Sequence, residues 1–127
     1  MESEPPVLSP PVLHVCVTCR AGNPLPADGV PPGAHLFAAL EGAPDLLVRP
    51  ARCLSACDAG CAAALSATGK WTYLLGRLRP ELADDLLAYA RTYAASATGA
   101  VLPSRRPPSL ARVVLGRVPG PGQEVPA

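Results

Sequence analysis

The hydrophobic and polar positions of the chain follow block patterns that predict a small α/β domain. Residues 12–17 form a mostly β-branched apolar run that ends in turn-forming residues, which is typical of a buried strand. Residues 34–42 place large apolar side chains at helical spacing before a glycine, and residues 45–49 form a second short apolar run between prolines. The first half of the chain therefore predicts the order strand, helix, strand.

The second half of the pattern predicts a β-hairpin and a longer helix. Residues 62–67 and 71–76 are two apolar runs joined by a tight turn at Thr68, Gly69 and Lys70. Pro80 stands at a first helical position before residues 81–97, whose apolar side chains fall on one face. Together the blocks predict a mixed sheet with flanking helices, an α/β fold of the thioredoxin type.

Prolines mark the expected limits of the domain. Residues 1–11 are proline-rich and are expected to form a disordered arm, which leaves residues 12–98 as the domain. Residues 99–127 are rich in proline and arginine, and only residues 110–115 are apolar enough to become ordered. This C-terminal tail is expected to pack along the domain, to dock a partner or to remain solvated.

Composition and charge argue against several classes of function. The 127 residues carry a formal net charge of +1, too small to attract nucleic acid or an anionic membrane without specific contacts. The chain has no apolar run long enough to span a bilayer and no secretory signal, so a cytoplasmic location is expected. The sequence also lacks paired carboxylates, a Ser/His/Asp set and a phosphate loop, so it does not predict an enzyme.

Five cysteines are the main candidates for chemistry: Cys16, Cys19, Cys53, Cys57 and Cys61. In a reducing compartment, cysteines in two tight blocks are typical of ligands or redox groups rather than disulfides. One block follows the first predicted strand and the other follows the second. If these strands are neighbours, the first four cysteines meet, and four thiolates can hold a zinc ion, a 2Fe-2S cluster or a 4Fe-4S cluster.

These residues resemble two related groups of proteins. Residues 53–60, Cys-Leu-Ser-Ala-Cys-Asp-Ala-Gly, precede an apolar strand, a glycine turn and an aromatic strand, and this succession resembles the second half of thioredoxin-like 2Fe-2S ferredoxins. Residues 12–115 resemble more closely a bacterial family of uncharacterised proteins described only as metal-binding, with Cys-Val-Thr-Cys-Arg and Gly-Lys-Trp-Thr-Tyr blocks of this kind. The resemblance implies a thioredoxin-like ferredoxin fold.

The resemblance also implies a ligand set. Cys53 and Cys57 match the second ligand pair of those ferredoxins, and Cys16 matches the first ligand by its position after the first strand. Cys19 follows Cys16 after only two residues, whereas the second ligand usually follows a longer loop. Cys61 stands where those ferredoxins commonly have proline, and it is an alternative ligand. The implied cofactor is a 2Fe-2S cluster held by Cys16, Cys19, Cys53 and Cys57.

The resemblance implies electron transfer with a protein partner. Proteins like this one are sometimes associated with cobalt and cobalamin metabolism, which suggests a reductase or a metal-chelatase component as that partner. Thioredoxin-like ferredoxins commonly dimerise, so a homodimer is expected. Arg20 and Arg52 adjoin cysteines, and they would offset the cluster's negative charge, dock an acidic partner or simply be solvated.

Three other interpretations of the cysteines stay open. The same pocket could hold zinc or another divalent metal, which would make the chain a metal-handling protein. Cys16 and Cys19 could form a thioredoxin-like dithiol pair, although the proline-rich stretch that follows delays the helix such a pair needs. The thiols could also be buried without a metal. His14 and His35 lack ligand spacing to the cysteines and are predicted to be structural or surface groups.

Overall fold

A computed structural model describes residues 10–18, 24, 27–52 and 60–123. The strands and main helices are, in chain order, β1 (Val12–Cys16), α1 (Pro32–Leu40), β2 (Leu47–Ala51), β3 (Ala63–Ser66), β4 (Thr72–Leu75), α2 (Ala83–Ala95) and β5 (Val114–Val118). Within the described residues, short 3₁₀ helices accompany them: η2 (Pro80–Leu82), η3 (Pro103–Arg105) and η4 (Pro108–Leu110). The predicted N-terminal arm lies outside the described residues, except for its last two.

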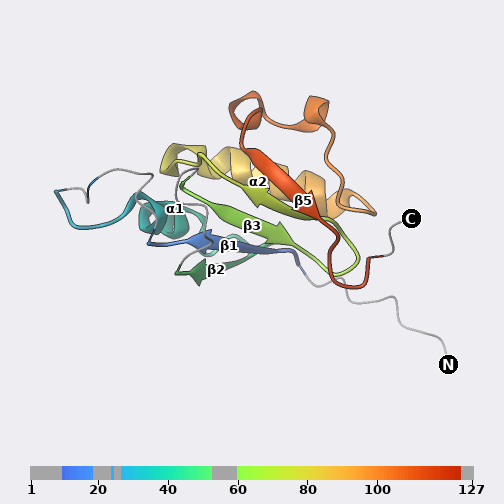
Figure 1. The fold of residues 1–127 in the computed structure, drawn as a ribbon, viewed down its shortest axis with the longest axis horizontal. Coiled ribbons are helices and arrows are strands. Elements are labelled where there is room, and N and C mark those ends of the chain that lie inside the picture. Colours follow the sequence, from blue (N-terminus) through green and yellow to red (C-terminus); the bar gives the residue numbers. More distant parts are fainter. Residues whose placement is uncertain (1–9, 19–23, 25–26, 53–59, 124–127) are drawn as a thin grey trace.

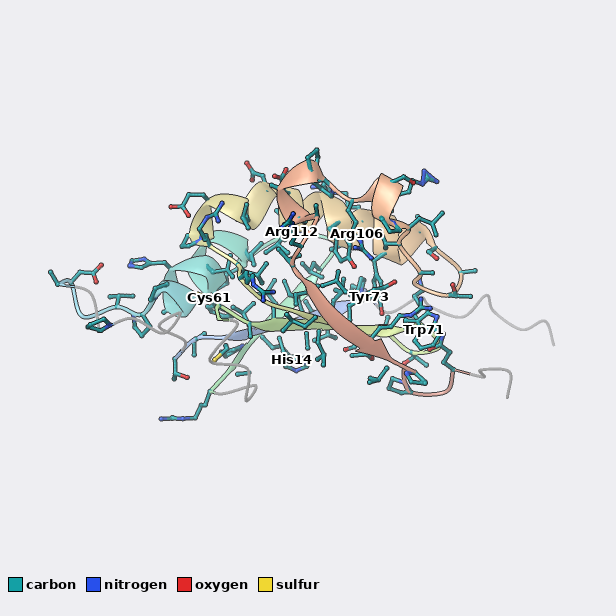
Figure 2. All side chains as sticks on the ribbon, turned by 45° about the horizontal axis from the view of Figure 1, so that its top comes forward. His14, Cys61, Trp71, Tyr73, Arg106 and Arg112 are labelled. Atoms are coloured by element: carbon teal, nitrogen blue, oxygen red, sulfur yellow. The ribbon has the colours of Figure 1, made fainter. Side chains whose placement is uncertain are left out.

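The five strands form one mixed sheet in the order β2-β1-β3-β4-β5 (Figure 1). β1 pairs with β2 in parallel, and the other neighbouring pairs are antiparallel. Both helices pack on the same face of this sheet (Figure 2). The strand, helix, strand, hairpin, helix order and the α/β architecture are therefore confirmed.

A proline stands at the start of α1 and at the start of the 3₁₀ turn that precedes α2. α1 has proline at its first position, and η2 begins at Pro80 and leads directly into α2. Asp84 and Asp85 lie in the first turn of α2, where carboxylates interact favourably with the helix dipole. Within the described residues, neither helix is long and apolar enough to cross a membrane.

A cluster of three tyrosines joins the hairpin to α2. The Tyr73 ring on β4 makes edge-to-face contacts with Tyr89 and Tyr93, with ring centroids 6.0 and 6.1 Å apart. The Tyr93 hydroxyl donates a hydrogen bond to the Trp71 carbonyl at 2.6 Å, and the Val101 amide donates to the Tyr73 hydroxyl at 3.1 Å. The aromatic strand therefore forms the centre of the hydrophobic core.

The C-terminal segment, expected from the sequence as a tail of residues 99–127, is described as far as residue 123 and packs on the sheet. β5 pairs with β4 and completes the sheet, and Val101, Leu110 and Val113 are buried in the core. The Arg117 guanidinium lies 4.0 Å from the centre of the Trp71 ring, so this arginine stacks on the hairpin while it stays exposed. Residues 99–123 therefore pack along the domain, the first of the three alternatives expected for this segment, through β5 and these buried apolar side chains.

Truncation of Leu110 should show that the core needs this segment. Leu110 is completely buried, so we expect Leu110→Ala to lower the free energy of unfolding by about 2–5 kcal/mol, measured by urea denaturation. Leu102→Ala is the matched control, since the Leu102 side chain is 63% exposed and should contribute little. Equal losses of unfolding free energy in the two variants would contradict this packing.

Two tyrosines of the cluster should respond differently to loss of the hydroxyl. The Tyr89 hydroxyl is buried and has no hydrogen-bond partner among the described residues, so Tyr89→Phe should leave the free energy of unfolding unchanged or slightly raised. Tyr93→Phe should lower it by about 1 kcal/mol, because the Trp71 carbonyl loses its donor. A larger loss in Tyr89→Phe than in Tyr93→Phe would contradict this.

The same tyrosines should make the protein sensitive to alkali. Burial raises the pKa of Tyr93 to about 12 and also raises the pKa of Tyr89. Below pH 10 the phenols hold their protons in both states, whereas above it the unfolded chain releases them first. The free energy of unfolding should therefore fall as the pH rises from about 10 towards 12. Urea titrations should show a shallower fall in Tyr93→Phe than in the native protein.

Candidate functional site

The candidate site begins where the two parallel strands end. β1 and β2 are neighbours, and their register pairs Cys16 with Ala51, the last residue of each strand. The Val17 amide extends the ladder by donating to the Ala51 carbonyl at 2.9 Å. The cysteine blocks are expected to meet if the first two strands are neighbours. The structure meets this condition, because β1 and β2 pair and end at the same edge of the sheet.

Cys16 is held at this edge by backbone on both sides. Its amide donates to the Ala62 carbonyl at 3.0 Å, and its Sγ lies 3.6 Å from both the Arg52 carbonyl oxygen and Thr18 Oγ1. The Thr18 hydroxyl itself donates to the Arg52 carbonyl. The Cys16 side chain is only 3% exposed. The thiol is thus fixed in a largely dry position between two segments that are distant in sequence.

The same contacts define where the other predicted ligands join the structure. Arg52 and Ala62 flank the stretch that carries Cys53 and Cys57, and both contact Cys16. Thr18, which immediately precedes Cys19, contacts Arg52. Cys19, Cys53 and Cys57, together with Arg20, lie outside the described residues. Of the four predicted ligands, the structure therefore places Cys16, and it places the points from which the others continue.

Cys61 and His14 lie near this edge in different surroundings. Cys61 is completely buried, and its carbonyl accepts a hydrogen bond from the Leu78 amide at 3.1 Å, which joins the start of β3 to the segment before α2 (Figure 2). His14 lies on the face of the sheet away from the helices. Within residues 10–18, 24, 27–52 and 60–123, three or more His, Cys, Asp or Glu side chains do not gather into a group that could hold a metal.

Two features of the edge were not evident from the sequence. Arg52 acts through its carbonyl oxygen, whereas the sequence draws attention to its guanidinium, which is exposed. Thr18 was not singled out at all, although its hydroxyl links the ends of the two strands. Both are contacts to backbone, and a pattern of residue types carries no signal for them.

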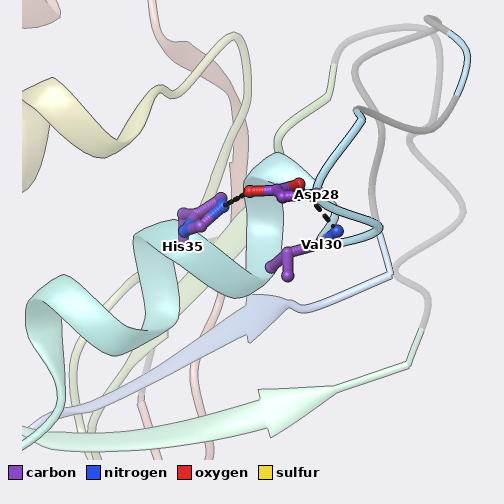
Figure 3. A network of polar contacts seen from close by, with 3 residues as sticks. All are labelled: Asp28, Val30 and His35. Carbon is purple, nitrogen blue, oxygen red and sulfur yellow. Dashed lines mark hydrogen bonds and ion pairs between the residues drawn. The ribbon is translucent and has the colours of Figure 1, made fainter.

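A second polar network ties the connection between β1 and α1 to the helix. The Asp28 carboxylate accepts a hydrogen bond from the Val30 amide at 2.9 Å, and its other oxygen lies 3.0 Å from His35 Nε2 (Figure 3). The Val30 bond, followed by the His35 contact, lowers the pKa of Asp28 below its usual value of 3.8. His35 is therefore a surface residue that fixes a loop.

The chain matches one family model and two solved structures. Residues 13–120 match the family "Protein of unknown function (DUF1636)". A thioredoxin-like [2Fe-2S] ferredoxin from Aquifex aeolicus is similar with a TM-score of 0.55 and 19% identity, covering 91% of this chain and 99% of that chain. A second structure, described as the wild-type thioredoxin-like [2Fe-2S] ferredoxin from Aquifex aeolicus, is similar with a TM-score of 0.51 and 17% identity. The similarity covers 85% of this chain and 98% of that chain.

These comparisons confirm the fold and leave the chemistry to be proposed. At such identities the likeness establishes a shared thioredoxin-like ferredoxin architecture. No curated protein has a sequence that matches this chain significantly. The family description gives no function, so metal binding stays a prediction.

The pKa of Asp28 tests the network in Figure 3. We expect its carboxyl group to titrate below 3.8 in an NMR pH titration, because the carboxylate is the form that accepts the Val30 bond. In His35→Ala the pKa should rise but stay below 3.8, since the backbone bond remains and is the larger cause. A native pKa at or above 3.8 would contradict the network.

Proposed function

The chain belongs to the DUF1636 family of proteins of unknown function, and we propose that it is a small electron-transfer protein with a cysteine-ligated 2Fe-2S cluster. The proposed ligands are Cys16, Cys19, Cys53 and Cys57. One observation carries the proposal: the segments bearing the last three all adjoin the contacts that surround Cys16. The fold shared with thioredoxin-like 2Fe-2S ferredoxins supports it.

Loss of the Cys16 thiol proton, which ligation requires, would leave no backbone acceptor unpaired. In the thiol form, both Cys16 and Thr18 can donate to the Arg52 carbonyl. When the thiol proton is lost, the Thr18 hydroxyl still satisfies this carbonyl, so no acceptor is left without a donor. The ladder bonds on both sides of Cys16 fix the direction of its side chain, as an inflexible ligand position requires.

A bound cluster of this type supplies the transfer of single electrons. The chain would hold the cluster in a mostly dry position, since Cys16 is almost fully buried, while its neighbour Arg52 is exposed. The Arg52 guanidinium could therefore meet an acidic surface on a protein redox partner. We propose a reductase or a metal-chelatase component as that partner, with the chain acting as a carrier and not as an enzyme, and we keep the homodimer as a proposal.

The alternatives differ in what they need from Cys16. A dithiol exchange centre needs an accessible thiolate, and the 3% exposure of Cys16 argues against that use. A zinc ion or another divalent metal would accept the same four thiolates, because soft sulfur ligands suit both. The content of acid-labile sulfide therefore distinguishes the two alternatives, because a 2Fe-2S cluster contains sulfide and a single bound metal ion does not.

Metal analysis of anaerobically purified, untagged protein tests the proposal directly. We expect iron and acid-labile sulfide at about two of each per chain, with visible charge-transfer absorption. Serine substitution of Cys16, Cys53 or Cys57 should abolish this absorption, because an alkoxide is a poor replacement for a thiolate ligand. Cys61→Ser is the matched control and should retain the cluster.

Three outcomes would change the assignment. Retention of the cluster in Cys57→Ser would overturn the ligand set. Loss in Cys61→Ser with retention in Cys19→Ser would make Cys61 the fourth ligand. Stoichiometric zinc or cobalt without sulfide would replace electron transfer by metal binding at the same thiolates.

A further inference from the structure

A groove lies between the C-terminal half of α2 and residues 100–105. Its cavity volume is about 500 Å³, within the range of about 300–1,000 Å³ that is usual for small-molecule sites. We propose that this groove binds a small anion with an apolar body, such as a phosphate monoester or an organic carboxylate.

The charges around the groove favour an anion. Arg91 on α2 and Arg105 on η3 both contribute to its lining, and no carboxylate is among the lining residues that the structure describes. Within the described residues, the ion pairs are those of His35 with Asp28 and of Arg79 with Glu81. Both groove guanidiniums are therefore available for a ligand, and a guanidinium binds a carboxylate or phosphate through paired hydrogen bonds.

A third guanidinium stands behind the wall of the groove. Arg106 Nη2 donates to the carbonyl of Val101, a lining residue, at 3.5 Å. Arg106 Nε is buried and has no hydrogen-bond partner in the part of the chain that the structure describes. Figure 2 shows Arg106 between the helix side of the sheet and the C-terminal segment. Its positive charge adds to that of Arg91 and Arg105, since Arg106 forms no ion pair with a carboxylate among the described residues.

The C-terminus of α2 would oppose an anion, and Lys70 counters it. The last carbonyls of a helix carry a partial negative charge. Lys70 Nζ lies 2.6 Å from the Ala94 carbonyl oxygen and 3.5 Å from that of Tyr93. This ammonium group therefore offsets part of the negative charge at the helix end, while Arg91 and Arg105 add positive charge to the groove.

The remaining lining sets the character of the ligand. Thr92 and Ser96 contribute hydroxyl groups along α2, while Val101 and Leu102 form an apolar wall on the other side. The 63% exposure of Leu102 is high for a large apolar side chain. A ligand with a charged head and an apolar body would meet the arginines at one part and cover Leu102 at another.

The groove is distinct from the cysteine site. α2 begins shortly after Leu78, which hydrogen-bonds Cys61, and it ends near Trp71, whose amide bonds the Thr98 carbonyl. The 13 residues of α2 span about 20 Å. A ligand here would therefore act away from Cys16, as an effector or a docking group and not as a cluster ligand.

Binding to the full-length protein, measured by calorimetry, tests the proposal. The probes are phenyl phosphate and benzoate, with benzyl alcohol as the uncharged control. We expect an anion to bind and the alcohol not to bind, and Arg91→Gln and Arg105→Gln each to raise Kd about tenfold. Arg112→Gln removes an exposed charge outside the groove and should leave Kd unchanged.

Each result decides a separate point. Stronger binding of one probe assigns the head group as phosphate or carboxylate. Equal binding of benzyl alcohol, equal effects of Arg112→Gln and Arg91→Gln, or no binding of either anion at millimolar concentration would overturn the proposal. Because the arginines lie on the surface, an unchanged Tm in the variants separates lost binding from lost folding. None of these outcomes depends on whether the cysteines hold a cluster.

Discussion

The parallel pairing of β1 with β2 is the constraint on which the arrangement of the site depends. A parallel pair brings two carboxyl ends to one edge of the sheet, and the antiparallel neighbour on the other side of β1 starts at that edge. Three chain segments therefore meet at Cys16 through backbone pairing, and the Cys16 and Thr18 side chains add their contacts to the Arg52 carbonyl. Had β2 been antiparallel, the two cysteine blocks would continue from opposite ends of the sheet.

The opposite side of the structure depends on the tyrosine cluster. Tyr73, Tyr89 and Tyr93 fasten α2 to the hairpin, and the Val101 amide joins the C-terminal segment to the same cluster. The tyrosine cluster adds its rings to a core that is otherwise mostly leucine, so a chain with only 4% aromatic residues still buries a continuous apolar core. It also leaves polar hydroxyls inside the core, and one of these has no partner among the described residues.

The sequence predicts the parts of the fold that depend on local periodicity. The runs at residues 12–17 and 62–67 become β1 and β3, because alternation and turn chemistry act over a few residues. Local periodicity does not predict β5, because this strand contains Gly116 and Arg117. These residues are stabilised by β4 and by the Trp71 ring, which are distant in sequence. The site divides in the same way: cysteine spacing indicates ligands, whereas Thr18 and the Arg52 carbonyl matter only once two strand ends are side by side.

The direction of the first and last strands has a practical consequence for the handling of the protein. β1 starts, and β5 ends, at the end of the sheet opposite Cys16, where the Gly69 amide donates to the Pro121 carbonyl at 2.7 Å (Figure 1). A reporter, a surface tether or a second domain fused before Pro10 or after Gln123 would thus be attached far from the cysteine edge. Immobilisation at Pro10 or Gln123 would present that edge outward, towards an electrode or a partner in solution.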